Sequence, residues 1–118
     1  MALAQYQELA VSFASALVEG DFARAAGMLG PPLNESTSAD DLQNCFDRMY
    51  SSYAESDRPT KVSFEPRFSG EDWPAKQNGD VGWAYVAVLG EECVEAVTVT
   101  VAESAGRMFI RYIEWGRP

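Results

Sequence analysis

Histidine is absent from this sequence of 118 residues. A Ser-His-Asp triad or a Cys-His pair therefore cannot be built from the side chains of this chain. A metal site would need carboxylates or the two cysteines as ligands. We therefore expect no metal site, and no motif in the sequence indicates a cofactor.

Cysteines and long apolar runs are also scarce. Cys45 and Cys93 fall at apolar positions of a predicted helix and a predicted strand, so we expect two reduced thiols rather than a disulfide. No apolar run approaches the ~20 residues of a membrane span. The first residues show neither the basic nor the apolar block of a signal peptide. These features favour a cytoplasmic protein with no membrane partner.

Basic residues are half as numerous as acidic ones, nine against eighteen, which gives a formal net charge of -9. A charge of this sign repels a phosphate backbone, so we expect no nucleic acid partner. Two interpretations of the acidity remain open. It can serve solubility alone, or it can steer the molecule toward a basic protein partner.

The length corresponds to one domain, residues 1–118, large enough to bury a core without disulfides. Apolar residues at helical spacing predict helices over residues 3–19, 22–29 and 39–54. Gly20 is expected to end the first helix and Asp21 to cap the second. The serines and threonine of residues 36–38 offer caps for the third.

The remaining sequence predicts four β-strands, over residues 61–68, 81–89, 93–102 and 107–115. In the first strand Val62, Phe64 and Phe68 should share one face, while Pro66 favours an edge or a bulge. Residues 69–80 read as a loop with Trp73 as its large apolar anchor. Three helices followed by a mainly antiparallel four-stranded sheet make an α+β fold with the helices on one face of the sheet.

Turn chemistry predicts the register of the last three strands. A two-residue turn at Gly90-Glu91 places Val88 opposite Cys93 and Val86 opposite Glu95. A four-residue loop over residues 103–106 places Glu95 opposite Glu114. A three-residue loop would slip the last strand by one residue and exchange its faces.

This register divides the side chains between two faces. The predicted core face carries Ala84, Val86, Val88, Cys93, Val97, Val99, Val101, Met108, Ile110 and Tyr112, with Glu95 and Glu114 at one end. The predicted outer face carries Trp83, Tyr85, Ala87, Thr98, Thr100, Phe109, Arg111, Ile113 and Trp115.

The order of elements, with the corner Val18-Glu19-Gly20-Asp21-Phe22-Ala23-Arg24-Ala25 between the first two helices, resembles the nuclear transport factor 2-like superfamily. This cystatin-like cone fold is shared with ketosteroid isomerase, scytalone dehydratase and polyketide cyclases. The resemblance covers nearly the whole chain but includes no catalytic motif. It implies a curved sheet and a pocket at one end of the core face.

Enzymes of that superfamily use a carboxylate base with a tyrosine or histidine. The nearest equivalents here are the catalytic candidates Glu95, Glu114 and Tyr112, with Tyr6 or Tyr50 from the helices. Two carboxylates paired ~5 Å apart would share a proton or bind a cation. The alternative is a splayed, solvated sheet end that leaves both acids in water.

The outer face predicts an interface, because aromatic residues and arginine are enriched where proteins bind each other. Relatives with the fold that the sequence resembles often pair through the sheet, which implies a homodimer. A distinct protein partner and coverage by the loop of residues 69–80 remain open as alternatives. We expect a non-enzymatic protein-binding domain, with bacterial immunity-type proteins of the superfamily as one model. The alternative is a pocket for a small apolar ligand, or an isomerase- or dehydratase-like enzyme. The interface candidates are Trp83, Tyr85, Phe109, Arg111, Ile113 and Trp115.

Overall fold

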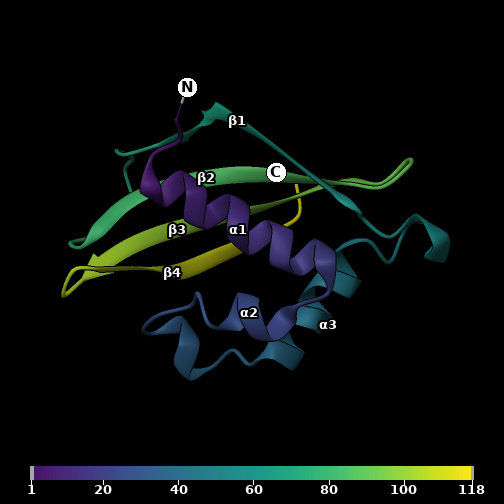
Figure 1. Ribbon diagram of the computed structural model, residues 1–118, viewed down its shortest axis with the longest axis horizontal. Coiled ribbons are helices and arrows are strands. Elements are labelled where there is room, and N and C mark those ends of the chain that lie inside the picture. The colour runs from purple at the N-terminus through teal and green to yellow at the C-terminus, as the bar shows by residue number, and fades with distance from the viewer. Residues whose placement is uncertain (1, 118) are drawn as a thin grey trace.

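The computed structural model describes residues 2–117. The chain has the predicted α+β fold, with three helices and a curved, antiparallel four-stranded sheet. The longest helix lies across one face of the sheet, and the other two lie beside one edge of it (Figure 1). The strands lie in the order β1-β2-β3-β4. The elements are α1 (Gln5–Glu19), α2 (Phe22–Ala26), α3 (Ala39–Met49), β1 (Lys61–Gly70), β2 (Asp80–Leu89), β3 (Val94–Ser104) and β4 (Arg107–Trp115). Within the described residues, no helix has the length and apolarity that a bilayer crossing requires.

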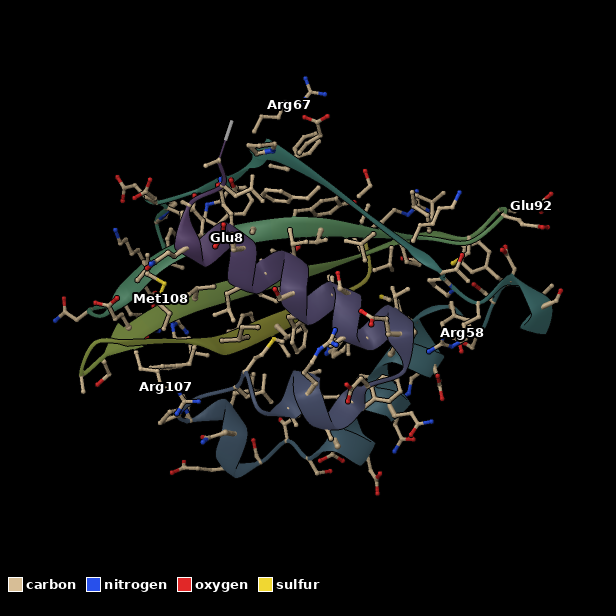
Figure 2. All side chains as sticks on the ribbon, in the orientation of Figure 1. Glu8, Arg58, Arg67, Glu92, Arg107 and Met108 are labelled. Carbon is tan, nitrogen blue, oxygen red and sulfur yellow. The ribbon has the colours of Figure 1, made fainter. Side chains whose placement is uncertain are left out.

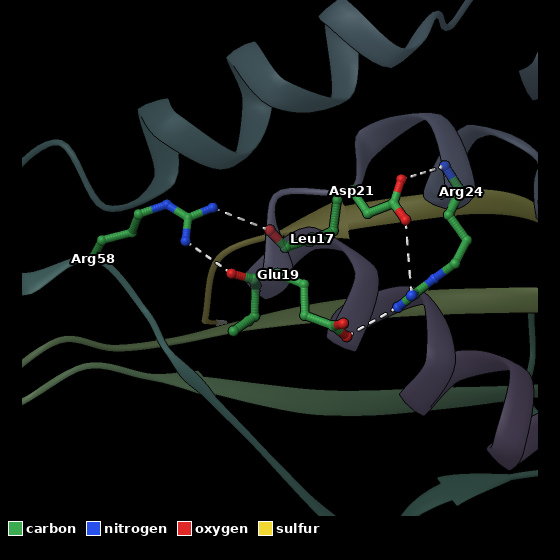
Figure 3. A network of polar contacts seen from close by, with 6 residues as sticks. Leu17, Glu19, Asp21, Arg24 and Arg58 are labelled. Carbon is green, nitrogen blue, oxygen red and sulfur yellow. Dashed lines mark hydrogen bonds and ion pairs between the residues drawn. The ribbon is translucent and has the colours of Figure 1, made fainter.

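The predicted helix caps are confirmed. α1 ends at Gly20, whose φ of 79° is left-handed, and this conformation costs glycine little. The Asp21 side chain accepts a hydrogen bond from the backbone N–H of Arg24 and so begins α2 (Figure 3). Ser38 and Asp41 form a capping box at the start of α3.

α2 and α3 end before the predicted residues, and the chain after each of them contacts the sheet. α2 ends at Ala26, and the chain then runs beside β4. There the Ile110 N–H donates to the Met28 carbonyl and the Gly30 N–H donates to the Ile110 carbonyl. α3 ends at Met49, and Tyr53 leaves the helix to donate its hydroxyl to the Val94 carbonyl.

α1 crosses the sheet over β2 (Figure 1). The core lies between this helix and the sheet. Tyr6 of α1 packs directly on the β2 backbone because Gly82 has no side chain. A Cβ at that position would lie only 2.6 Å from the Tyr6 ring. α3 contributes to the same cluster, since its Leu42 and Phe46 are fully buried. Three residues of the predicted core face are buried in that cluster as well: Val86, Val97 and Ile110.

β1 is an edge strand with an irregularity around Pro66, as its missing N–H predicted. The pairing changes from Phe64 opposite Val86 to Ser69 opposite Ala84. Because the register shifts by an odd number of residues, the β1 side chains after the irregularity point to the opposite faces of the sheet. The prediction that Phe68 shares a face with Phe64 is therefore wrong. Phe68 is 45% exposed and lies edge-on to Tyr85, with ring centroids 6.0 Å apart.

The β2–β3 turn is longer than predicted. Val88 lies opposite Glu95 and Val86 opposite Val97, so the register is shifted by two residues from the prediction. The cause is Asp57, whose carboxylate accepts the backbone N–H groups of Glu91 and Glu92. A shift of two preserves the faces of β3.

The β3–β4 turn is shorter than predicted, with Ala105 and Gly106 at φ 53° and 78° and Ser104 opposite Arg107. The turn lies at the opposite end of the sheet from Glu92 (Figure 2). Further along β4, Val101 pairs with Ile110 but Thr100 pairs with Tyr112. Arg111 is therefore an extra residue, a β-bulge. It exchanges the two faces for the rest of β4.

Candidate functional site

The bulge at Arg111 separates the three catalytic candidates. Tyr112 lies opposite Thr100 and Glu114 lies opposite Thr98, so both side chains belong to the outer face. Glu95 lies opposite Val88 on the core face. The prediction that Glu95 pairs with Glu114 is therefore wrong, and the two carboxylates do not form the shared-proton pair on which the enzymatic alternative depended.

Because of the same bulge, two of the predicted interface residues lie on the core face, so their assignment to the interface is wrong. Ile113 and Trp115 lie opposite Val99 and Val97, on the core face, where both pack against the buried cluster. They are not part of the outer face.

Phe109 does belong to the outer face, but it leans toward the chain that follows α2. A Cβ placed on Gly30 would overlap the Phe109 ring. That ring is therefore held against the Gly30 backbone and is not among the residues that line a cleft over the sheet.

The core face opens at one end into a cleft of about 390 Å³. Its carboxylate is Glu95, which accepts hydrogen bonds from the Tyr53 hydroxyl and from the Arg117 backbone N–H, both at 3.3 Å. Tyr53 thus takes the place expected for Tyr6, which is buried under α1, or Tyr50, which donates to Asp47. The cleft is lined by Cys45, Arg48, Met49, Glu95, Trp115, Gly116 and Arg117.

Both cysteine thiols are free, as predicted. Cys45 is half-buried at the core-face cleft. Cys93 is fully buried, and its burial raises the pKa of the thiol. Cys93 is therefore held as an unreactive thiol.

A larger cleft, of about 670 Å³, lies on the outer face between the sheet and the loop that joins β1 to β2. We call it the outer cleft. The loop supplies Trp73 as one wall, while β2 supplies Trp83 and β4 supplies Tyr112, which is 49% exposed. The lining residues are Asp72, Trp73, Pro74, Ala75, Gln77, Trp83, Thr98, Thr100, Arg111, Tyr112 and Glu114.

The outer cleft is built on an ion pair between Arg111 and Asp80. The guanidinium Nε and Nη2 donate to the two carboxylate oxygens at 2.5 and 2.7 Å. The Asp80 side chain has no exposed surface, and it also accepts the Gln77 backbone N–H. Because Asp80 ends the loop and Arg111 is the bulged residue of β4, the pair fixes the loop to the sheet.

This pair is a structural one rather than an acid/base couple. The hydrogen bond from Arg111 lowers the pKa of the Asp80 carboxyl below its usual value, although burial opposes the change. The same hydrogen bond raises the pKa of the Arg111 guanidinium. Both groups stay ionised near neutral pH, so neither can exchange a proton with a ligand there.

Gly70 positions the Trp83 indole. The two residues face each other across β1 and β2, and a Cβ on Gly70 would lie 2.9 Å from the indole Nε1. The indole therefore folds over the bare backbone of Gly70 and stays half-buried at the cleft.

No family model, curated protein or solved structure matches the chain. The chemistry of the clefts is therefore inferred from their own residues. Within residues 2–117, no three metal-ligating side chains lie close enough together to hold an ion. The outer cleft offers aromatic faces, threonine hydroxyls and two exposed carboxylates around a fixed ion pair, an arrangement suited to recognition.

Sequence reasoning found Trp83 and Arg111 but missed how they are held. In the sequence, Asp80 is an acidic residue of the predicted loop of residues 69–80. Tyr53 followed the helical spacing of α3 and gave no sign that it leaves the helix. Coverage of the outer face by the loop that carries Trp73 was one of the alternatives left open, and Trp73 forms one wall of an open cleft.

Proposed function

We propose that this protein is a non-enzymatic, protein-binding domain of the nuclear transport factor 2-like superfamily that takes a protein partner in its outer cleft. The observation that carries the proposal is the partial exposure of Trp73 and Trp83 beside the exposed Tyr112, around the Arg111–Asp80 pair. Tryptophan, tyrosine and arginine dominate the hot spots of protein interfaces. A fixed ion pair keeps such a surface in one shape before binding, which lowers the entropic cost of association.

Charge favours a distinct partner over a second copy. Each chain carries a formal charge of -9, and a homodimer through this face would bring the carboxylates of Asp72 and Glu114 toward their own copies. A basic partner would gain attraction and a faster encounter instead. An immunity-type or accessory protein of the bacterial cytoplasm, which neutralises a basic target, fits this charge.

The core-face cleft supports a second candidate function, the binding of a small, largely apolar ligand. Met49 and Trp115 provide apolar surface there, and the Glu95 carboxylate is oriented by the Tyr53 hydroxyl. Without Glu114 beside it, Glu95 lacks the second carboxylate that the enzymatic alternative required. A ligand in this cleft would shift the Trp115 indole signal in NMR spectra and leave those of Trp73 and Trp83 unchanged.

Site-specific photo-crosslinking in cells of the organism that makes the protein tests the proposal. A benzophenone amino acid replaces Tyr112 at the outer cleft, and in a matched variant it replaces Gln43, an exposed residue of α3. We expect one crosslinked partner from position 112, none from position 43, and loss of the adduct when Trp83→Ala is added.

Equal crosslinking from both positions, or an adduct that survives Trp83→Ala, would contradict the proposal. An adduct at twice the mass of the chain would assign the face to self-association and overturn the distinct partner.

A further inference from the structure

Two of the charges at the outer cleft lack a counter-ion. Of its charged lining residues, Arg111 is neutralised by Asp80, which leaves the carboxylates of Asp72 and Glu114. Both side chains are exposed, and the ion pairs within residues 2–117 use other carboxylates, those of Glu19, Asp21 and Asp80. The residues that line the cleft, together with Asp80, therefore carry a net negative charge.

The aromatic residues of the cleft suit the same kind of occupant. A cation is attracted to the face of an indole or phenol ring, most strongly to tryptophan. Trp73 already shows this preference, because the Lys76 ammonium lies 5.8 Å from its ring centroid. Trp83 and Tyr112 line the same cleft with part of their surface open to solvent.

The floor of the cleft offers hydrogen-bonding groups that are not used by the protein itself. Thr100 is only 9% exposed, and its hydroxyl makes none of the hydrogen bonds within residues 2–117. No fully buried side-chain oxygen in that part of the chain lacks a partner, so this hydroxyl opens into the cleft. It can accept an N–H from an occupant.

We propose that the outer cleft recognises an arginine side chain presented by a basic segment of the protein partner. The guanidinium plane would lie against the indole faces while its N–H groups reach the carboxylates of Asp72 and Glu114. Arginine fits better than lysine because its flat, weakly hydrated fork both stacks on aromatic rings and pairs with carboxylates. This inference rests on the proposed function and adds the chemistry of the partner.

The test uses N-acetyl-arginine amide as a probe and N-acetyl-citrulline amide as its uncharged isostere. The sequence contains three tryptophans, and the indole N–H signals of the ¹⁵N-labelled protein report each one separately. We expect the arginine probe to shift Trp73 and Trp83 at millimolar concentration, while Trp115, on the core face, stays unchanged. The citrulline probe should shift none of them at the same concentration.

A matched pair of variants tests the role of charge. Glu114→Gln should weaken the binding of the arginine probe about fivefold, the factor expected for loss of one partly exposed charge pair. Glu103→Gln, which removes an exposed carboxylate outside the cleft, should leave its affinity unchanged.

Equal shifts with both probes would overturn the cation inference and leave the protein-binding proposal standing, since the cleft would still bind. An arginine probe that shifts Trp115 alone, or no indole at all, would overturn the inference as well. The crosslinking experiment tests the protein-binding proposal separately, because its result does not depend on which side chain of the partner enters the cleft.

Discussion

At the scale of single residues, Arg111 has two roles. Its backbone is the extra residue that exchanges the faces of β4, and its side chain neutralises the buried carboxylate of Asp80. A carboxylate without exposed surface is costly unless it is paired. This contact therefore helps to hold the loop wall of the outer cleft against the sheet.

The pH dependence of stability tests that contact. The folded pKa of Asp80 is lowered by Arg111, so the stabilising contribution of the pair is complete above the unfolded value of ~3.9 and is lost as the pH falls through the folded value. We expect Asp80→Asn to lower the free energy of unfolding by about 3 kcal/mol at neutral pH. The difference from wild type should stay constant down to about pH 5 and shrink below about pH 4.

Urea unfolding followed by circular dichroism at a series of pH values gives this difference directly. Asp72→Asn, at an exposed position of the same loop, is the control and should leave the stability curve unchanged. A wild-type advantage over Asp80→Asn that persists undiminished to pH 2 would contradict the assigned role.

At the scale of the elements, the end of α1 is fixed by a residue that precedes β1. The Arg58 guanidinium donates to the carbonyls of Val18 and Leu17 at 2.8 and 3.3 Å (Figure 3). It also lies 5.5 Å from the ring centroid of Phe46 in α3. These contacts join α1, α3 and the chain entering β1, and a positive group suits the C-terminal end of a helix.

Two arginines near this corner should respond differently to truncation. Arg58→Ala should lower the free energy of unfolding by about 1–2 kcal/mol, because two part-buried carbonyls lose their donor. Arg24→Ala is the matched control, because the ion pairs of Arg24 with Glu19 and Asp21 are exposed. This substitution should change the free energy of unfolding by too little to measure. Equal effects of the two substitutions in thermal or urea unfolding would refute the proposed role of Arg58.

Hydrophobic periodicity was enough to predict the elements, their order and the fold class, because helices and strands repeat at different spacings. It could not predict registers that depend on distant residues. Asp57 lengthens the β2–β3 turn from more than thirty positions away. The bulge at Arg111 carries neither glycine nor proline, so its local sequence reads as an uninterrupted strand. Because of this one extra residue, Tyr112 and Glu114 lie in the outer cleft and Trp115 lies outside the predicted interface.

At the scale of the whole molecule, the sheet presents different chemistry on its two faces. α1 lies across the core face, and the small cleft beside Glu95 and Trp115 lies at one end of it. The outer face carries the larger cleft, fixed by Asp80 and Arg111 and lined by aromatic rings. A partner bound at the outer cleft would contact Trp83 and would not contact Trp115.

The affinity of the crosslinked partner for Trp83→Ala and for Trp115→Ala, measured by calorimetry, tests this account most directly. Circular dichroism checks that each variant is folded. We predict that Trp83→Ala loses at least about thirtyfold in affinity, corresponding to a hot spot of about 2 kcal/mol. Trp115→Ala should bind with the affinity of the wild type and lose thermal stability instead, because Trp115 packs against the core. A folded Trp83→Ala protein that binds the partner as tightly as the wild type would contradict the account.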